Sequence, residues 1–143
     1  VIDKALRYVT SELKNVFQIL KDMEQPVEIR TRRFIQVYAE TVYKYPDIIR
    51  YMIDQKIHNS ESHVEYSDFL EYEGIPLLLD TFRELYPEER HYIEPYLRTV
   101  QVLSSISFPL LMRSAIEKIC GLDLQNEQTR KEFFPLLIDH LLR

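Results

Sequence analysis

Apolar residues recur at intervals of three and four along most of the chain, which is the spacing of one face of an α-helix. The clearest stripe lies between Val1 and about Met23 and consists of Ile2, Ala5, Leu6, Val9, Leu13, Val16, Phe17 and Leu20. The same spacing predicts further helices over residues 26–45, 46–57, 62–86, 91–120 and 126–143. The pattern therefore predicts an all-α fold, an antiparallel bundle of about six helices.

Proline and glycine mark where these helices begin and end. Pro26, Pro46 and Pro95 fit the first turns of their helices, where the missing backbone N–H has no intrahelical partner. Gly121 follows an apolar helical stretch and suits a left-handed cap. The first helix has no such start signal, because the apolar pattern is already running at Ile2 without a preceding capping residue. We therefore expect a chain cut from a longer protein.

Two interruptions are expected inside helices. Gly74 and Pro76 fall in the middle of the helical pattern over residues 62–86, so a kink or short break is expected there. Pro109 is expected to bend the long helix over residues 91–120. Helices that are kinked in this way pack imperfectly, which favours a gap inside the bundle.

Composition agrees with one helical domain. The chain has 143 residues, about the size of one domain, and it contains only two glycines. The net charge is −5, and the dense basic cluster is limited to Arg30, Arg32 and Arg33. Because nucleic-acid affinity depends on neutralising phosphates, this segment alone is expected to bind DNA poorly.

The single cysteine and the short apolar runs bear on the cellular compartment of the protein. Cys120 has no second cysteine with which to form an internal disulfide, which fits a reducing compartment. The longest apolar runs are well below the roughly 20 residues that a membrane-spanning helix needs. We therefore expect a cytoplasmic protein with no membrane partner.

Catalytic and metal-binding patterns are weak. Among the four histidines, His58, His63, His91 and His140, only His91 has a Glu three residues earlier, and a second Glu-x-x-His half-site is absent. Two separated glycines cannot form a phosphate-binding loop, and no serine lies in a nucleophile elbow. The sequence predicts no catalytic residues, no metal and no cofactor. A helical enzyme remains the third-ranked class.

Two features of the sequence favour a binding function over a catalytic one. The chain has ten Tyr and seven Phe, and many of them fall on faces that are predicted to point inward. Gaps between helices that have apolar walls and a few polar anchors are common small-molecule sites, although a fully packed core explains the same aromatics equally well. In addition, the last helix carries apolar residues on more than one stripe, so it must be covered on two sides. A symmetric dimer through the last two helices would provide that cover.

Four segments resemble the regulatory domains of the TetR/AcrR family of transcriptional regulators. The stretch Tyr43-Lys-Tyr-Pro-Asp-Ile-Ile-Arg-Tyr-Met52 is similar to the junction of the family's second and third regulatory helices. The stretches Ser107-Phe-Pro-Leu-Leu-Met-Arg113, Cys120-Gly-Leu-Asp123 and Phe133-Phe-Pro-Leu-Leu-Ile-Asp-His-Leu-Leu142 are similar to its final two helices. The order and lengths of the helices agree as well. The family's diagnostic helix-turn-helix motif is not in this sequence.

The resemblance implies an effector-sensing and dimerisation domain that spans residues 1–143. The first helix would connect to an N-terminal DNA-binding domain, and a small, largely apolar or aromatic effector would control DNA binding through that missing domain. The predicted ligand-binding residues are Phe34, Tyr38, Thr41, Tyr51, Phe82, Tyr96 and Ser104. The predicted homodimer interface consists of Leu103, Ile106, Leu110, Phe133, Leu137 and Leu141. The main alternative is a helical protein-interaction or scaffold module without a ligand pocket.

Overall fold

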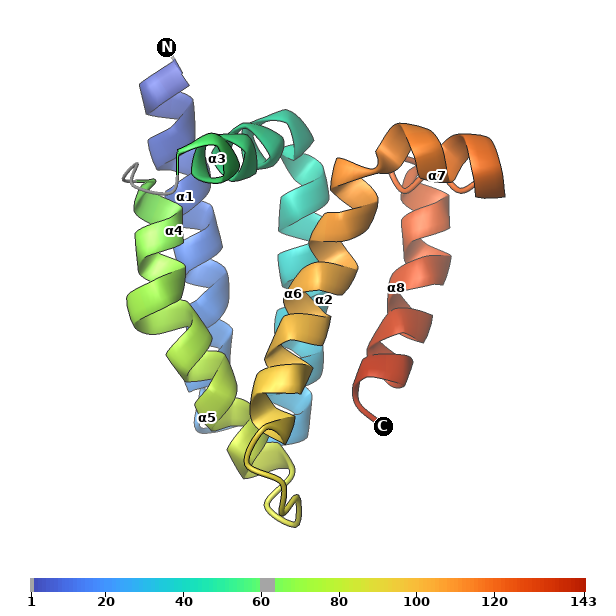
Figure 1. The fold of residues 1–143 in the computed structure, drawn as a ribbon. Helices are drawn as coiled ribbons and strands as arrows, with labels where there is room; N and C mark the ends of the chain where they lie inside the picture. Colours follow the sequence, from blue (N-terminus) through green and yellow to red (C-terminus); the bar gives the residue numbers. More distant parts are fainter. Residues whose placement is uncertain (1, 60–63) are drawn as a thin grey trace.

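The fold is all-α, as predicted (Figure 1). The computed structural model describes residues 2–59 and 64–143, so the predicted helix start at Ser62 and the histidine His63 lie outside the described residues. The elements are α1 (Ile2–Phe17), a short 3₁₀ turn η1 (Gln18–Lys21), α2 (Val27–Lys44), α3 (Pro46–His58), α4 (Glu65–Phe69), a π-helical turn η2 (Leu70–Gly74), α5 (Ile75–Leu85), α6 (Glu94–Leu111), α7 (Arg113–Cys120) and α8 (Glu127–Leu141).

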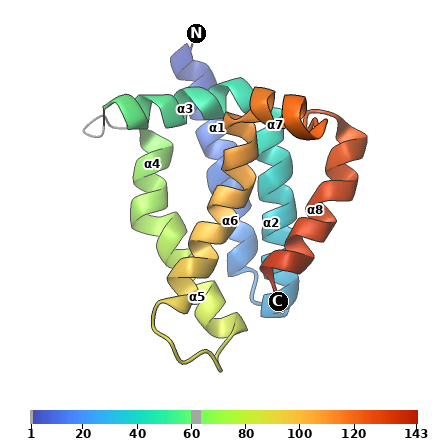
Figure 2. The same cartoon turned by 45° about the vertical axis from the view of Figure 1, so that its right-hand side comes forward.

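Helix α2 lies at the centre of the bundle, and α1, α3, α5, α6 and α8 all contact it (Figures 1 and 2). Its sequence explains this position, because buried residues occur on more than one side of it, including Phe34, Ile35, Tyr38 and Ala39. The apolar stripe that was predicted for this part of the chain is buried from Val9 onward in α1, whereas Ile2 is exposed. The first turn of α1 extends past α3 at one end of the bundle.

Helices α4 and α5 form one continuous rod through the π-turn, so the expected interruption is a change of helix type. Pro76 cannot donate a hydrogen bond, and its ring would clash with the carbonyl of the residue four positions earlier in a regular α-helix. The wider turn avoids this conflict, and the N–H of Ile75 instead bonds to the carbonyl oxygen of Leu70, five residues earlier. Gly74 in this turn is buried against the ring of Phe17.

The predicted long helix over residues 91–120 is wrong, because it consists of two helices. α6 ends at Leu111, and α7 follows at an angle of 81°. Pro109 lies inside the last turn of α6, where it donates no hydrogen bond and weakens the helix just before the break. Gly121 ends α7 with φ of 67°, the left-handed cap that was predicted. No single helix among the described residues is long and apolar enough to cross a membrane, although α6 and α7 taken together meet that criterion by length and composition.

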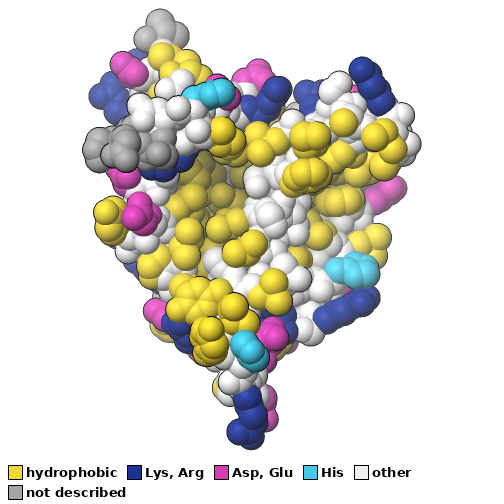
Figure 3. Space-filling view, in the orientation of Figure 1, with side chains coloured by type: hydrophobic (Ala, Val, Ile, Leu, Met, Phe, Trp, Pro, Cys, Tyr) yellow, Lys and Arg dark blue, Asp and Glu magenta, His cyan; other side chains and the backbone are white. Residues whose placement is uncertain are grey.

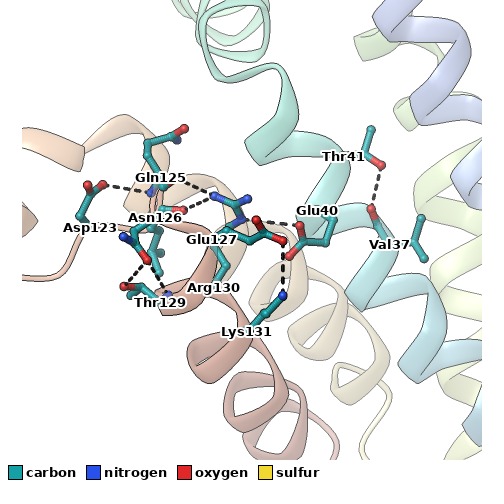
Figure 4. Close-up of polar contacts among 11 residues, drawn as sticks. Val37, Glu40, Thr41, Asp123, Gln125, Asn126, Glu127, Thr129, Arg130 and Lys131 are labelled. Carbon is teal, nitrogen blue, oxygen red and sulfur yellow. Dashed lines mark hydrogen bonds and ion pairs between the residues drawn. The ribbon is translucent and has the colours of Figure 1, made fainter.

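Polar contacts fix the first turn of α8 against α2 (Figure 4). The side chain of Asn126 accepts a hydrogen bond from the backbone N–H of Thr129 at 3.0 Å, which caps the helix. Nη1 of Arg130 donates to the carbonyl oxygens of Leu124 and Gln125 at 3.0 and 2.9 Å. Its Nε lies 3.5 Å from a carboxylate oxygen of Glu40 on α2, so one arginine holds both the loop before α8 and the central helix.

A second buried arginine connects the beginning of α2 with the end of α5. Arg30 is 3% exposed, and its Nη2 donates to Glu84 at 2.9 Å. Its Nη1 donates to the carbonyl oxygen of Gln25 at 3.1 Å. Arg30 therefore belongs to the structural framework, whereas its neighbour Arg33 is exposed.

Candidate ligand-binding cavity

An apolar cavity of about 320 Å³ lies between α2, α3, α4 and α6. Figure 3 shows it as a hollow with hydrophobic side chains, below α3 and between α4 and α6. The residues that line this apolar cavity are Tyr38, Val42, Ile49, Met52, Ile53, Lys56, Ile57, Val64, Tyr66, Ser67, Leu70, Leu103, Ile106 and Ser107. A volume of this size matches the lower range of small-molecule sites, about 300–1,000 Å³.

Two tyrosines supply the most buried polar groups of the cavity. Tyr38 on α2 and Tyr66 on α4, which we call the tyrosine pair, are 7% and 8% exposed. Their hydroxyl oxygens are 2.7 Å apart and share a hydrogen bond. Burial raises the pKa of Tyr38 to about 12 and raises the pKa of Tyr66 well above its ordinary value. Both phenols are therefore neutral at physiological pH.

The rear of the cavity is an aromatic cluster that reaches α1. The ring of Phe34 stacks on Tyr38 with centroids 5.5 Å apart. Phe17, at the end of α1, contacts the rings of Phe34, Tyr38 and Phe69 at 4.8, 5.9 and 5.1 Å. The wall of the cavity and the last turn of α1 are thus parts of one packed core.

One hydrogen bond holds the α6 side of the cavity on α2. The hydroxyl of the buried Tyr43 donates to the carbonyl oxygen of Ile106 at 3.2 Å. Ile106 itself is fully buried and lines the cavity. Burial raises the pKa of Tyr43 to about 12, so its hydroxyl remains a donor at physiological pH.

A second hollow, of about 430 Å³, lies between α1 and α3 next to the apolar cavity. It shares Met52 and Val64 with the cavity, but its lining includes Asp3, Arg7 and Glu65, whose side chains are exposed. It is larger, yet it is a solvated surface groove with charged edges. The apolar cavity is the better candidate because its lining is mainly apolar and comes from four helices.

The structure brings one of the seven predicted ligand-binding residues, Tyr38, to the apolar cavity. Phe34 and Phe82 are buried as predicted, but they are core residues outside its lining. Phe34 supports Tyr38 from behind, and Phe82 stacks on Tyr86 with centroids 6.5 Å apart.

The other four predicted residues lie on other surfaces. Thr41 faces the side of α2 near Glu40 and Arg130, and its hydroxyl donates to the Val37 carbonyl oxygen at 2.8 Å (Figure 4). Tyr51 lines the groove between α1 and α3 and is 36% exposed. Tyr96 is 47% exposed. Ser104 is exposed on α6 and donates to the carbonyl oxygen of Val100.

Sequence reasoning missed most of the cavity lining, Tyr66 above all. Tyr66 precedes Phe69 and Leu70 at helical spacing, so the apolar face of α4 was visible in the sequence. Its partner Tyr38 is 28 residues away, and only the packing of α4 against α2 brings the two hydroxyls together.

The predicted dimer residues on α6 are wrong. Ile106 and Leu110 are fully buried inside the monomer, and Leu103 lines the apolar cavity. On α8, Phe133, Leu137 and Leu141 are half-buried and pack against the core. The error arose because α6 is apolar on two faces, and periodicity alone does not show which face meets the core.

The opposite face of α6 carries an exposed apolar stripe. This outer stripe consists of Leu97, Val100, Phe108 and Leu111, with Ser104 in the middle. Val100 is 62% exposed and Phe108 is 57% exposed. The stripe continues towards α7, which has no buried residue and carries Ile119 at 82% exposure.

Within residues 2–59 and 64–143, no group of three or more His, Cys, Asp or Glu side chains is placed to hold a metal ion. Comparison with protein families, curated proteins and solved structures found no match. The structure offers two candidate features for function, the apolar cavity and the outer stripe of α6.

Proposed function

We propose that this domain binds a small, largely apolar or aromatic effector in the apolar cavity and forms a homodimer through the outer faces of α6 and α8. The observation that carries the proposal is the cavity of about 320 Å³, which is lined mainly by aliphatic side chains and holds a buried tyrosine pair. In this proposal the domain is the cytoplasmic, effector-sensing part of a TetR-family transcriptional repressor. DNA would be bound by a helix-turn-helix domain outside this sequence.

The contacts of α1 supply a physical route from effector to DNA-binding domain. Phe17 on α1 packs against Tyr38 of the cavity wall, and Lys14 on α1 forms an ion pair with Glu65 on α4 at 2.9 Å. An effector that moves α2 or α4 must also shift these contacts with α1. To release DNA, the effector has to bind the DNA-free state better than the DNA-bound state, and DNA would weaken effector binding by the same factor.

A thermal-shift screen with uncharged apolar and aromatic compounds tests effector binding. Ser107→Phe places a large side chain in the cavity and should abolish stabilisation by any active compound. Ser11→Phe is the matched control, because Ser11 is also a helical serine but is exposed on α1, outside the cavity lining and outside α6 and α8. Equal responses of the two variants would contradict binding in the cavity.

Light scattering at micromolar protein concentration tests the dimer. We expect a dimer, and Val100→Glu in the outer stripe should convert it to a monomer. Tyr72→Glu is the control, because Tyr72 is 74% exposed on the α4–α5 rod, away from α6. A stable monomer of the unmodified chain would contradict pairing.

The exposed stripe and α7 also favour a second candidate, a helical interaction module that binds a different protein. A monomer in light scattering, together with a screen in which no compound stabilises the domain, is the result that this alternative expects.

A further inference from the structure

The tyrosine pair has one hydrogen-bond donor more than it can use internally. Each phenol carries one O–H group, and a single proton lies between two oxygens that are 2.7 Å apart. Whichever tyrosine donates, the hydroxyl of the other retains its own proton. Among the described residues, the bond between the two hydroxyls is the only hydrogen bond that either of them makes, so that proton is not used within this part of the protein.

The spare donor persists at physiological pH and lies among mainly apolar side chains. Both tyrosines are more than nine-tenths buried, and burial keeps their pKa values above the ordinary one, so neither proton is lost. A buried O–H group without an acceptor lowers the stability of whatever state contains it. A ligand that supplies an acceptor removes this cost, whereas a hydrocarbon leaves it in place.

We propose that the spare hydroxyl of the tyrosine pair faces the apolar cavity and donates to a hydrogen-bond acceptor on the effector, a carbonyl or ether oxygen of an otherwise apolar, uncharged molecule. This inference rests on the proposed function, because it specifies the ligand of the same cavity. A carboxylate would receive one hydrogen bond from the pair, and an ionised group in apolar surroundings requires several donors. Because the cation of Lys56 also lines the cavity, a carboxylate ligand is included in the test below.

The test compares two ligands of similar shape, benzophenone with a carbonyl oxygen and diphenylmethane without one. Displacement of the uncharged fluorescent dye N-phenyl-1-naphthylamine gives the dissociation constant of each ligand. Diphenylmethane is the more apolar compound, so the informative quantity is how the ratio of the two constants changes between proteins. Differences in ligand hydration cancel in that comparison.

The variant is Tyr38→Phe combined with Tyr66→Phe, because either single variant leaves one hydroxyl that can still donate. We expect the preference for benzophenone over diphenylmethane to fall by about fivefold in the double variant, the factor of one ordinary hydrogen bond. Tyr86→Phe is the matched control. It also removes a tyrosine hydroxyl, but Tyr86 lies at the end of α5, stacks on Phe82 and does not line the cavity, so the ratio should not change.

Each other outcome has a defined meaning. If both ligands displace the dye but the double variant leaves the ratio unchanged, the acceptor inference is overturned and the sensor proposal stands. If dye and ligands all fail to bind the unmodified protein, the proposed function fails and the inference fails with it. Stronger displacement by diphenylacetate than by benzophenone would overturn the assignment to uncharged ligands.

Photochemistry of benzophenone locates the ligand independently of affinity. Irradiation of the complex should insert the ketone into C–H bonds of residues found in the cavity but not in the neighbouring groove, such as Leu103 and Ile106. Cross-links confined to α1 would place the ligand in the groove between α1 and α3 and overturn the inference.

Discussion

Gly74 provides a sharp test of the packing described above, because two effects of a Gly74→Ala substitution oppose each other. The backbone of Gly74 is in the ordinary right-handed helical region, with φ of −67°. Alanine there would gain about 1 kcal/mol from its higher helix propensity. A Cβ at this position, however, would lie 3.1 Å from Cε1 of Phe17 and 3.2 Å from Cδ2 of Leu70.

The steric effect should win because Phe17 cannot move away. Its ring is fully buried and contacts three other aromatic rings. Overpacking a filled core costs about 1–3 kcal/mol, so Gly74→Ala should lower the free energy of unfolding by about 1 kcal/mol after the helix gain. For a chain of this length, that corresponds to a melting temperature lower by about 3 °C.

Urea and thermal unfolding followed by circular dichroism measure this change. Phe17→Leu provides the internal control, since a smaller side chain at position 17 leaves room for the new methyl group. In that background Gly74→Ala should stabilise the protein by up to about 1 kcal/mol. If Gly74→Ala stabilises the unmodified protein, the packing of Phe17 against the π-turn is looser than described.

Three further predictions concern stability. Burial raises the pKa of both members of the tyrosine pair above the value of about 10 that they have in the unfolded chain. Their contribution to the free energy of unfolding is therefore fully present below about pH 10 and is lost as the pH rises towards about 12. The Tyr→Phe double variant should therefore lose less stability than the unmodified protein between about pH 9 and about pH 11 in urea titrations, and parallel losses would contradict this. Arg30→Ala should cost about 2 kcal/mol because the arginine is buried and bonded on two sides, whereas Arg33→Ala on the surface should change the melting temperature little. Asn126→Ala removes the cap of α8 and should cost about 1 kcal/mol, with Gln128→Ala as the neutral exposed control.

The helical framework was predictable because its signals are local. Pro46 begins α3 and Gly121 ends α7 as expected, since each residue imposes its own backbone geometry. The interruption near Pro76 was also expected, but its form as a π-turn depends on how the rod packs against Phe17. The break after Leu111 was missed, because Pro109 indicated a bend without indicating that the helix would end there.

The candidate site was much less predictable, because it depends on which face of each helix turns inward. Tyr38 and Thr41 are three residues apart on α2, yet Tyr38 lines the cavity and Thr41 lies on another side of the helix. On α6, Ile106 is buried while Val100 is exposed, although both fit an apolar stripe. Periodicity identifies such faces, but tertiary packing decides their partners.

The π-turn between α4 and α5 makes the length of this rod adjustable. A π-turn contains one residue more than the α-helical turn it replaces, so removing one residue keeps the flanking helices in register, although the regular turn would then bring back the clash of Pro76 with the preceding turn. Tyr72 is 74% exposed in this turn, so its loss would remove few contacts. Deleting a residue in the middle of α2 would instead rotate half of its core-facing side chains by about 100°. Helix α4, and the cavity wall that it forms, therefore lies beside a helical segment in which losing one residue disturbs the core less than the same loss inside α2.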